Sequence, residues 1–328
     1  MSTVSIIVPC YNEQNTICLL LDALYAQDYP RSEMVVIIAD GLSTDRTREE
    51  IVSFQASHPE LSVLIIDNLD RTIPTGLNRA IEVAQSDIIV RLDAHSIPRS
   101  DYVSRIVKAL ESGLGDNVGG VWEIQPGGNG WQAKSISKAA AHFLGVGDAH
   151  YRYTNRAQIV DTVPFGAYYR SLIDQIGPYD EAMLTNEDYE FNTRLRKAGG
   201  TIWLDPSISS IYFARSTYRE LANQYWRYGF WKAQMLRRYP DAIKWRQALP
   251  PLFILSLVAL LILAVWFPIA IWLLLVEVMI YTLVLLTVGI QLSIKHRDPA
   301  LLMGIILAIV TMHFSWGSAF LWGMLKKA

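Results

Sequence analysis

The sequence predicts an α/β fold in which a doubly wound, mostly parallel sheet is followed by helices that cross a membrane. Up to Asp93, short β-branched runs alternate with helical patterns of about ten residues, which is typical of βαβ units. After residue 246 charged residues become rare, and apolar stretches long enough to cross a bilayer follow. We therefore predict a cytoplasmic domain at residues 1–246, with an interface helix region at 217–246, and a membrane domain at 247–328 with about three transmembrane helices.

The bulk composition supports this division and excludes some partners. The chain has 328 residues, of which 51% are hydrophobic, and a formal net charge of -2 at pH 7. A net charge near zero argues against nucleic acid as the main partner, because phosphate binding normally needs a basic face. Cys10 and Cys18 fit no disulfide framework or metal-finger spacing, so we expect reduced thiols in a cytosolic domain. The apolar run at 4–8 stops at Pro9 and has no basic segment before it, which argues against a signal peptide.

Strands and helices are expected to alternate through the first half of the domain. Apolar and β-branched runs predict strands at 4–8, 34–39, 61–66 and 88–93. Leucines at helical spacing predict a helix at 16–25. A second helix runs to about residue 58, with Ser43 or Thr44 as its N-cap, and a third is expected at 77–84.

The second half of the domain is less regular. Strands are expected at 118–125, within 160–170, at 201–204 and at 208–213. Helices are expected at 133–145 and 187–199. A long helix at 217–239 mixes aromatic and basic residues, which is typical of helices at a membrane interface, although an ordinary packed amphipathic helix also fits.

The apolar remainder predicts membrane crossings. Residues 250–294 are long enough for two, with a bend at Pro268, and 299–324 supply a third. Basic residues before the first segment and between the second and third place both points in the cytoplasm. Three crossings then leave the C-terminal lysines outside, against that tendency, and a re-entrant or surface-lying first segment removes the conflict. Glu277 is expected to pair with a neighbouring helix.

Asp93 and His95 follow directly after the strand expected at 88–93. Ligands of open α/β sheets bind at this carboxyl edge, where a carboxylate and an imidazole two residues apart can converge on a divalent cation. Such ligands suit Mg²⁺ or Mn²⁺, and the imidazole favours Mn²⁺. A polar turn that ends the strand is the alternative.

Four motifs in order resemble the family 2 glycosyltransferases. They are Pro9-Cys10-Tyr11-Asn12-Glu13, Asp40-Gly41-x-Ser43-x-Asp45-x-Thr47, Asp93-x-His95 and Asn186-Glu187-Asp188. The stretches RLDAH, NEDYEFNTRLRKAG and QYWRYGFWK are similar to the branch of succinoglycan-type glucosyltransferases. The likeness covers about residues 4–246 and implies a GT-A-type catalytic domain.

The resemblance implies a nucleotide-sugar donor and a divalent metal held by Asp93 and His95, although family members commonly have Asp in place of His95. It assigns to the nucleotide or its phosphates Pro9, Tyr11, Glu13, Asp40 and Arg71. Of these, Asp40 resembles the carboxylate that reads the base. Asn78 is a further candidate for contact with the nucleotide or its phosphates. The alternatives are a solvated arginine for Arg71 and a helix-turn asparagine for Asn78.

The resemblance also implies the catalytic pair. Asp188 resembles the base that deprotonates the acceptor, and Glu187 beside it holds the acceptor or tunes Asp188. An adjacent carboxylate and partial desolvation both raise an aspartate pKa towards useful values. Capping of the following helix is the alternative role, and the two roles are compatible.

The segment Gln224-Tyr225-Trp226-Arg227-Tyr228 resembles the Gln-x-x-Arg-Trp motif of processive synthases, with Tyr in place of Trp. The likeness implies that Arg227 or Lys232 clamps the leaving diphosphate. Contacts with the acceptor are assigned to Gly166, Gln224 and Tyr228. The Tyr substitution and the short membrane domain argue against processive extrusion.

We therefore expect a metal-dependent inverting glycosyltransferase of the inner or plasma membrane, with its catalytic domain in the cytoplasm. UDP-glucose is the first choice of donor, and a membrane-linked saccharide in polysaccharide biosynthesis is the expected acceptor. A polyprenyl-phosphate monosaccharide synthase and a non-catalytic nucleotide-binding membrane scaffold are the alternatives. A nicotinamide oxidoreductase is disfavoured, because no Gly-x-Gly-x-x-Gly follows the first strand.

Overall fold

The computed structural model describes residues 1–242 and 244–326, and the chain divides into two compact units. The first unit comprises Met1–Glu123 and His150–Tyr212. The second comprises Ile124–Ala149 and Phe213–Ala328. The functional boundary at residue 246, which composition suggested, stays a prediction.

One mixed sheet runs through the described part of the chain. Its strands are β1 (Val4–Cys10), β2 (Met34–Asp40), β3 (Ser62–Asp67), β4 (Ile88–Arg91), β5 (Ile97–Pro98), β6 (Asn117–Pro126), β7 (Gln158–Ile159), β8 (Ala167–Tyr169) and β9 (Ile202–Ala214). Their order is β3-β2-β1-β4-β8-β6-β9-β5, and β7 pairs with β9. The first four strands are parallel, whereas β8 runs antiparallel to β4.

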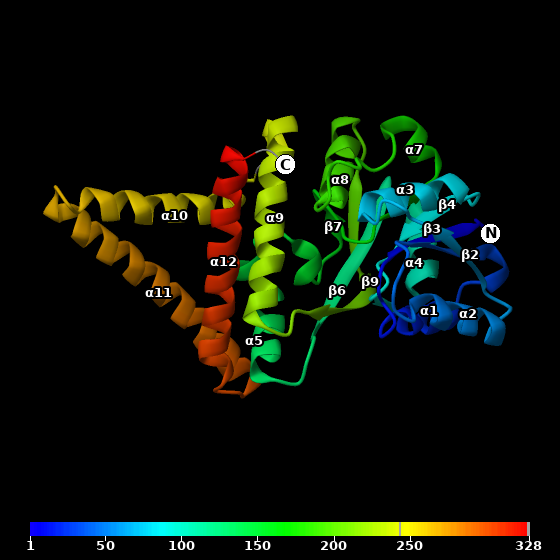
Figure 1. Ribbon diagram of the computed structural model, residues 1–328, viewed down its shortest axis with the longest axis horizontal. Helices are drawn as coiled ribbons and strands as arrows, with labels where there is room; N and C mark the ends of the chain where they lie inside the picture. Colours follow the sequence, from blue (N-terminus) through cyan, green and yellow to red (C-terminus); the bar gives the residue numbers. More distant parts are fainter. Residues whose placement is uncertain (243, 327–328) are drawn as a thin grey trace. The chain divides into compact units, whose positions relative to one another are not determined.

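Helices cover both faces of the sheet in the first unit (Figure 1). One face packs against α1 (Ile17–Tyr25), α2 (Thr47–Ser57) and α4 (Tyr102–Glu111). The other packs against α3 (Ile73–Val83), α7 (Ser171–Ile176) and α8 (Glu187–Lys197). Ile6 and Ile7 of β1 are both fully buried yet belong to opposite faces, because successive strand residues point to opposite sides. The predicted doubly wound, mostly parallel α/β fold is confirmed.

Two helix starts differ from the sequence prediction. Neither Ser43 nor Thr44 is an N-cap, because α2 begins at Thr47, whose backbone N–H donates to the Asp45 carboxylate at 3.0 Å. The helix expected at 77–84 begins four residues earlier, where Thr72 accepts a hydrogen bond from the Thr75 N–H.

Two other elements are divided differently. The helix expected at 133–145 is two helices, α5 (Trp131–Ala140) and α6 (Phe143–Val146), because extended His142 interrupts it and caps the second through its Nδ1. The strands expected at 201–204 and 208–213 are one strand, β9, which continues through Pro206. Proline is tolerated in a strand where no backbone donor is needed.

The second unit is helical beyond the ends of β6 and β9. Besides α5 and α6 it contains α9 (Tyr218–Arg238), α10 (Trp245–Leu263), α11 (Pro268–His296) and α12 (Leu301–Leu325). Short 3-10 turns lie at η1 (Arg31–Glu33) and η2 (His150–Arg152) in the first unit and at η3 (Pro240–Ala242) in the second.

Three helices of the second unit, α10, α11 and α12, are long and apolar enough to cross a membrane, with 19, 29 and 25 residues. The break predicted at Pro268 is confirmed, since α11 starts there. The expected partner of Glu277 is Ser256 of α10, whose hydroxyl donates to the carboxylate.

Candidate active site

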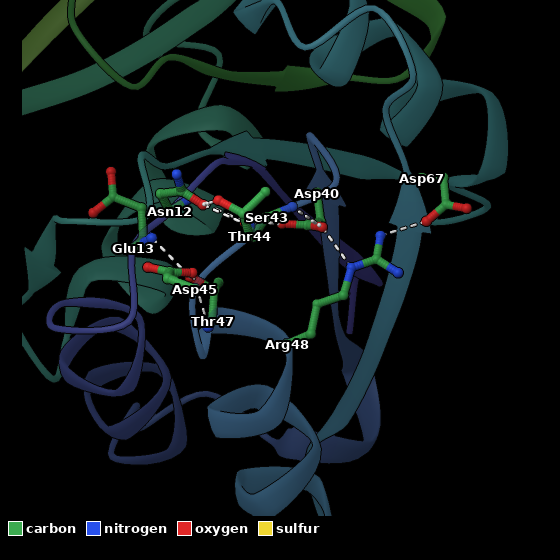
Figure 2. A network of polar contacts seen from close by, with 9 residues as sticks. All are labelled: Asn12, Glu13, Asp40, Ser43, Thr44, Asp45, Thr47, Arg48 and Asp67. Carbon is green, nitrogen blue, oxygen red and sulfur yellow. Dashed lines mark hydrogen bonds and ion pairs between the residues drawn. The ribbon is translucent and has the colours of Figure 1, made fainter.

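The loops that follow β1 and β2 interlock at the carboxyl edge of the sheet (Figure 2). Asn12, in the left-handed region with φ 54°, donates its N–H to the Ser43 hydroxyl at 2.9 Å. Its side-chain oxygen accepts from the Thr44 N–H at 2.8 Å. The Glu13 N–H donates to the Thr47 hydroxyl at 2.8 Å. These bonds give a physical reason for the spacing of the first two sequence motifs, because each loop holds the other in place.

Asp40, the last residue of β2, is fully buried at the base of this network. Its carboxylate accepts from the Ser43 N–H at 3.0 Å and from Arg48 Nε at 2.5 Å. The same guanidinium also pairs with Asp67 (Figure 2). Asp40 thus holds Ser43 and Arg48 in position, and these two side chains are more exposed than its own carboxylate. The sequence did not single out Arg48 as a site residue. The available signal was an arginine eight residues after Asp40, at the start of the next helix, where it can pair with that carboxylate.

The other residues assigned to the nucleotide lie at the same edge. Tyr11 is 44% exposed, and the Arg71 guanidinium carbon lies 5.9 Å from the centre of its ring. Pro9 is half-buried within β1. Asn78, by contrast, is buried, and its amide holds the backbone of Tyr179 through two hydrogen bonds; a contact with the nucleotide stays a prediction.

The Asp93-Ala94-His95 segment follows β4, which ends at Arg91 instead of the expected Asp93. His95 Nδ1 lies 3.0 Å from Glu13 Oε1, so this loop contacts the loop after β1. The side chains of Asp93 and His95 are 24% and 38% exposed, which leaves both accessible to a ligand.

Arg91 joins this loop to α8, and sequence reasoning missed it. The side chain is only 5% exposed; its Nη2 lies 2.7 Å from Glu187 Oε1 and 3.3 Å from Asp93 Oδ1. Within the described residues, its Nε and Nη1 have no hydrogen-bond partner. A buried cation is costly without an anionic partner. The signal that could have revealed it was a single arginine inside the otherwise apolar run at 88–92.

Asp188 lies beside Glu187 in the first turn of α8 and is half-buried. Desolvation, and then the charge of Glu187, raise the pKa of Asp188 to about 6, against the opposing effect of Arg91. Both carboxylates also complement the helix dipole, so the structural role and a chemical role are compatible. The geometry therefore brings the predicted base and the predicted metal ligand Asp93 to one charged cluster around Arg91.

The comparisons with known proteins identify the family. Residues 5–177 match the model of the glycosyl transferase family 2. The chain is 31% identical over 318 residues to the succinoglycan biosynthesis protein ExoA of Rhizobium meliloti, covering 96% of this chain and 93% of that protein. The chain belongs to glycosyl transferase family 2. It is thus a glycosyltransferase of glycan biosynthesis, as the four motifs implied.

Two further similarities support the family assignment and the fold. The family 2 chain is 27% identical over 309 residues to a dolichyl N-acetyl-alpha-D-glucosaminyl phosphate 3-beta-D-2,3-diacetamido-2,3-dideoxy-beta-D-glucuronosyltransferase of Methanococcus voltae, covering 91% and 90% of the two chains. The mannosyltransferase PcManGT from Pyrobaculum calidifontis, solved with GDP-Man and Mn²⁺, matches with a TM-score of 0.59 at 22% identity, covering 95% of this chain and 87% of that one. The fold of the first unit is of GT-A type.

Asp93 and His95 are the predicted ligands of a divalent cation. Among the described residues, no three His, Cys, Asp or Glu side chains gather into a group that could hold an ion. Two accessible protein ligands suit a cation whose remaining ligands come from substrate phosphates and water, which is the usual arrangement for Mg²⁺ in nucleotide enzymes. The donor set of this family 2 enzyme is therefore compatible with a cation that binds together with the diphosphate.

The remaining site predictions fall in different environments. Gly166 is buried, and a Cβ there would lie 2.4 Å from Asn117 Oδ1, so packing alone requires glycine. On α9, Gln224 Nε2 donates to the Tyr228 hydroxyl at 3.0 Å. Lys232 is buried, whereas Arg227 is exposed. The acceptor and diphosphate roles of Gly166, Gln224, Tyr228, Arg227 and Lys232 stay predictions.

Proposed function

We propose that this glycosyltransferase moves a sugar from a nucleotide-sugar donor to a hydroxyl of a membrane-linked saccharide, with inversion at the anomeric carbon. The ion-pair chain Asp93–Arg91–Glu187 is the observation that carries the proposal. This chain connects two parts of the site. One is the loop after β4, which we assign to the donor diphosphate, and the other is the first turn of α8, which bears Asp188.

The loops after β1, β2 and β3 hold the nucleotide. Tyr11 and Arg71 supply an exposed aromatic face and a cation for the base and phosphates, and Asp40 fixes the Ser43 loop. UDP-glucose is the proposed donor because of the likeness to the succinoglycan-type branch. PcManGT, which shares the fold, was solved with GDP-Man, which supports a nucleotide sugar as donor and leaves the identity of the sugar to experiment.

Asp93 and His95 hold the Mn²⁺ or Mg²⁺ ion. When bound, such an ion supplies Lewis-acid stabilisation to the departing diphosphate. Arg91 orients Asp93 through an ion pair from its Nη2, and the Glu13 carboxylate orients the His95 ring through the ring's Nδ1. Arg227 or Lys232 adds positive charge for the diphosphate.

Asp188 removes the proton from the acceptor hydroxyl. A pKa of about 6 leaves it ionised at pH 7 and still basic enough to accept a proton as the new bond forms. The acceptor oxygen then attacks the anomeric carbon from the side opposite to the diphosphate, so an α-linked donor gives a β-glycoside. Glu187 is held by Arg91 and keeps Asp188 basic through its charge.

A lipid-linked saccharide is the proposed acceptor, with Gln224 and Tyr228 as contacts. The apolar C-terminal helices support a membrane-bound substrate, as does the dolichyl-linked substrate in the name of the Methanococcus relative. Anchoring by these helices with the catalytic domain in the cytoplasm follows from the basic flanks of α10 and α11. A phosphate acceptor, as in a polyprenyl-phosphate monosaccharide synthase, needs no base and leaves the basicity of Asp188 unused.

The test is diphosphate release by purified, detergent-solubilised protein from a panel of nucleotide sugars, with lipid extract as acceptor. Mn²⁺, Mg²⁺ and EDTA are compared for the wild type, Asp93→Ala and Asp188→Asn, with exposed Asp174→Asn as the matched control. Metal-dependent turnover of one donor, lost in the first two variants only, supports the proposal. Turnover that survives Asp188→Asn favours a phosphate acceptor, and no turnover with any donor or membrane extract favours the scaffold.

A further inference from the structure

Within the second unit, α9 and α12 lie side by side along their lengths (Figure 1). The Tyr218 hydroxyl donates to the Gly304 carbonyl at 3.1 Å near one end. Arg237 Nη2 donates to the Met324 carbonyl at 2.8 Å near the other. Because the residue numbers rise together in the two helices, the helices are parallel and in register over about five turns.

The contact between these helices is close at its centre. A Cβ on Gly229 of α9 would lie 2.2 Å from the Trp316 carbonyl oxygen of α12, so only glycine fits there. On α5, the Ser135 hydroxyl occupies the space of a Cβ on Gly304, at 2.0 Å. Two helices of mixed polarity, α9 and α5, therefore cover part of α12. In its most apolar stretch 39% of the residues are buried, against 6% in α10 and 11% in α11.

The companion helix α9 is unsuited to the hydrocarbon core of a bilayer. Asn223 and Arg227 are exposed close to the middle of α9, next to the central contact at Gly229. A membrane position that takes α12 through the core also takes Arg227 into the core. A charged side chain at that depth is costly and rare unless it faces protein or water.

The α10–α11 pair has the opposite character. Both helices expose apolar side chains along most of their length, and the one acidic group between them, Glu277, is bonded to Ser256. At 1.5 Å per residue they are about 28 and 44 Å long, which is enough for a hydrocarbon core of about 30 Å. In Figure 1, α10 runs across α12 instead of along it, so a membrane crossed by α10 has α9 and α12 along its surface.

We propose that only α10 and α11 cross the bilayer, and that α12, together with α5 and α9, lies along its surface with its exposed apolar side chains in the lipid interface. Helices with one apolar and one covered or polar face bind in this manner. Their partner is the lipid surface on the side of the catalytic domain. This proposal does not depend on the reaction proposed above.

The distribution of cations agrees with two crossings. Arg238 and Arg246 precede or begin α10, Lys295 and Arg297 end α11, and Lys326 follows α12. With two crossings all of them lie on one side of the membrane, as the positive-inside tendency requires. Three crossings leave the C-terminal lysines outside, against the positive-inside tendency. Placing the third apolar segment on the membrane surface, and not the first, removes this conflict.

Cysteine labelling in sealed membrane vesicles tests the topology. Cys10→Ala and Cys18→Ser remove the native thiols, and single cysteines are then introduced as Ser53→Cys, Val265→Cys and Ala300→Cys, or appended after Ala328. Ser53 lies exposed on α2 and reports the side of the catalytic domain. A membrane-impermeant maleimide is added before and after detergent lysis, and the melting temperature of each variant is compared with that of the parent. Pro299→Cys replaces Ala300→Cys if the latter folds poorly.

The proposal requires the cysteines at 53, at 300 and after 328 to be labelled from the same side, and the cysteine at 265 from the other. Labelling of the appended cysteine from the side of position 265 means that α12 crosses, which overturns the proposal. Labelling of all four from one side means that neither α10 nor α11 crosses, which overturns it as well.

Discussion

Replacing Asp188 by asparagine is expected to slow catalysis strongly while stabilising the fold. The side chains have nearly the same shape, so the change removes the charge and leaves the packing of α8 intact. Burial beside Glu187 raises the pKa of Asp188 from 3.8 to about 6, so the folded protein resists ionising this group. At about 1.4 kcal/mol per pKa unit, the ionised carboxylate costs up to about 3 kcal/mol of folding stability at pH 7.

The sign of the pH dependence follows from the raised pKa. Below its unfolded-state pKa the aspartate is protonated in both states and is not penalised, and the penalty grows as the pH rises through about 6. Asp188→Asn is therefore expected to melt several degrees above the wild type at pH 7, with a difference that shrinks towards pH 4. Turnover is expected to fall by about 10² to 10⁴, the usual contribution of a general base.

The assay is thermal unfolding in detergent at several pH values, beside diphosphate release at saturating donor. Asp174→Asn, which removes an exposed carboxylate, is expected to change neither quantity. An Asp188→Asn variant that melts below the wild type at pH 7, or that keeps full turnover, refutes the view that Asp188 is a half-buried, ionised base.

Three further predictions concern the same cluster and its surroundings. Arg91→Met leaves two carboxylates without their cation and is expected to lower the free energy of unfolding, measured by chemical denaturation, by about 3 to 5 kcal/mol. The control Arg105→Met breaks only a surface ion pair and is expected to lower it by at most about 1 kcal/mol. Equal losses in the two variants contradict the assignment of Arg91 to a buried ion pair. In the wild type, kcat/KM is expected to fall tenfold per pH unit below about pH 6, and a profile flat to pH 4 excludes Asp188 as the titrating base. Ser43→Ala loosens the loop that Asp40 holds and is expected to raise the KM for the donor with little change in kcat, so a loss confined to kcat speaks against a binding role.

The order of strands and helices was predictable because it is a local property. Runs such as 34–39 and 88–90 are apolar on both faces, and only a sheet covered on both sides suits them. The motif after β4 was recognisable because sheet topology puts the carboxyl ends of parallel strands at one edge. Ser43 was misjudged as a helix cap because its hydroxyl and N–H bond to Asp40, a preference that composition near the helix does not reveal.

Partners distant in sequence were not predictable. Arg91 and Glu187 are separated by 96 positions, so nothing local distinguishes the arginine from a strand interruption. Hydropathy likewise scores α10, α11 and α12 as equivalent spans, because it does not register that α9 covers α12 and bears Arg227. Both omissions concern charged residues whose energies depend on a neighbour brought in by the fold.

The most direct test of the proposed reaction is the structure of its product. Lipid-linked saccharide is incubated with the protein, metal and ¹³C-labelled donor sugar, and the extracted lipid is analysed by mass spectrometry and NMR. We expect one added sugar, attached to a saccharide hydroxyl in the β configuration. A sugar attached through the lipid phosphate, or an α linkage from an α-linked donor, contradicts the proposed reaction.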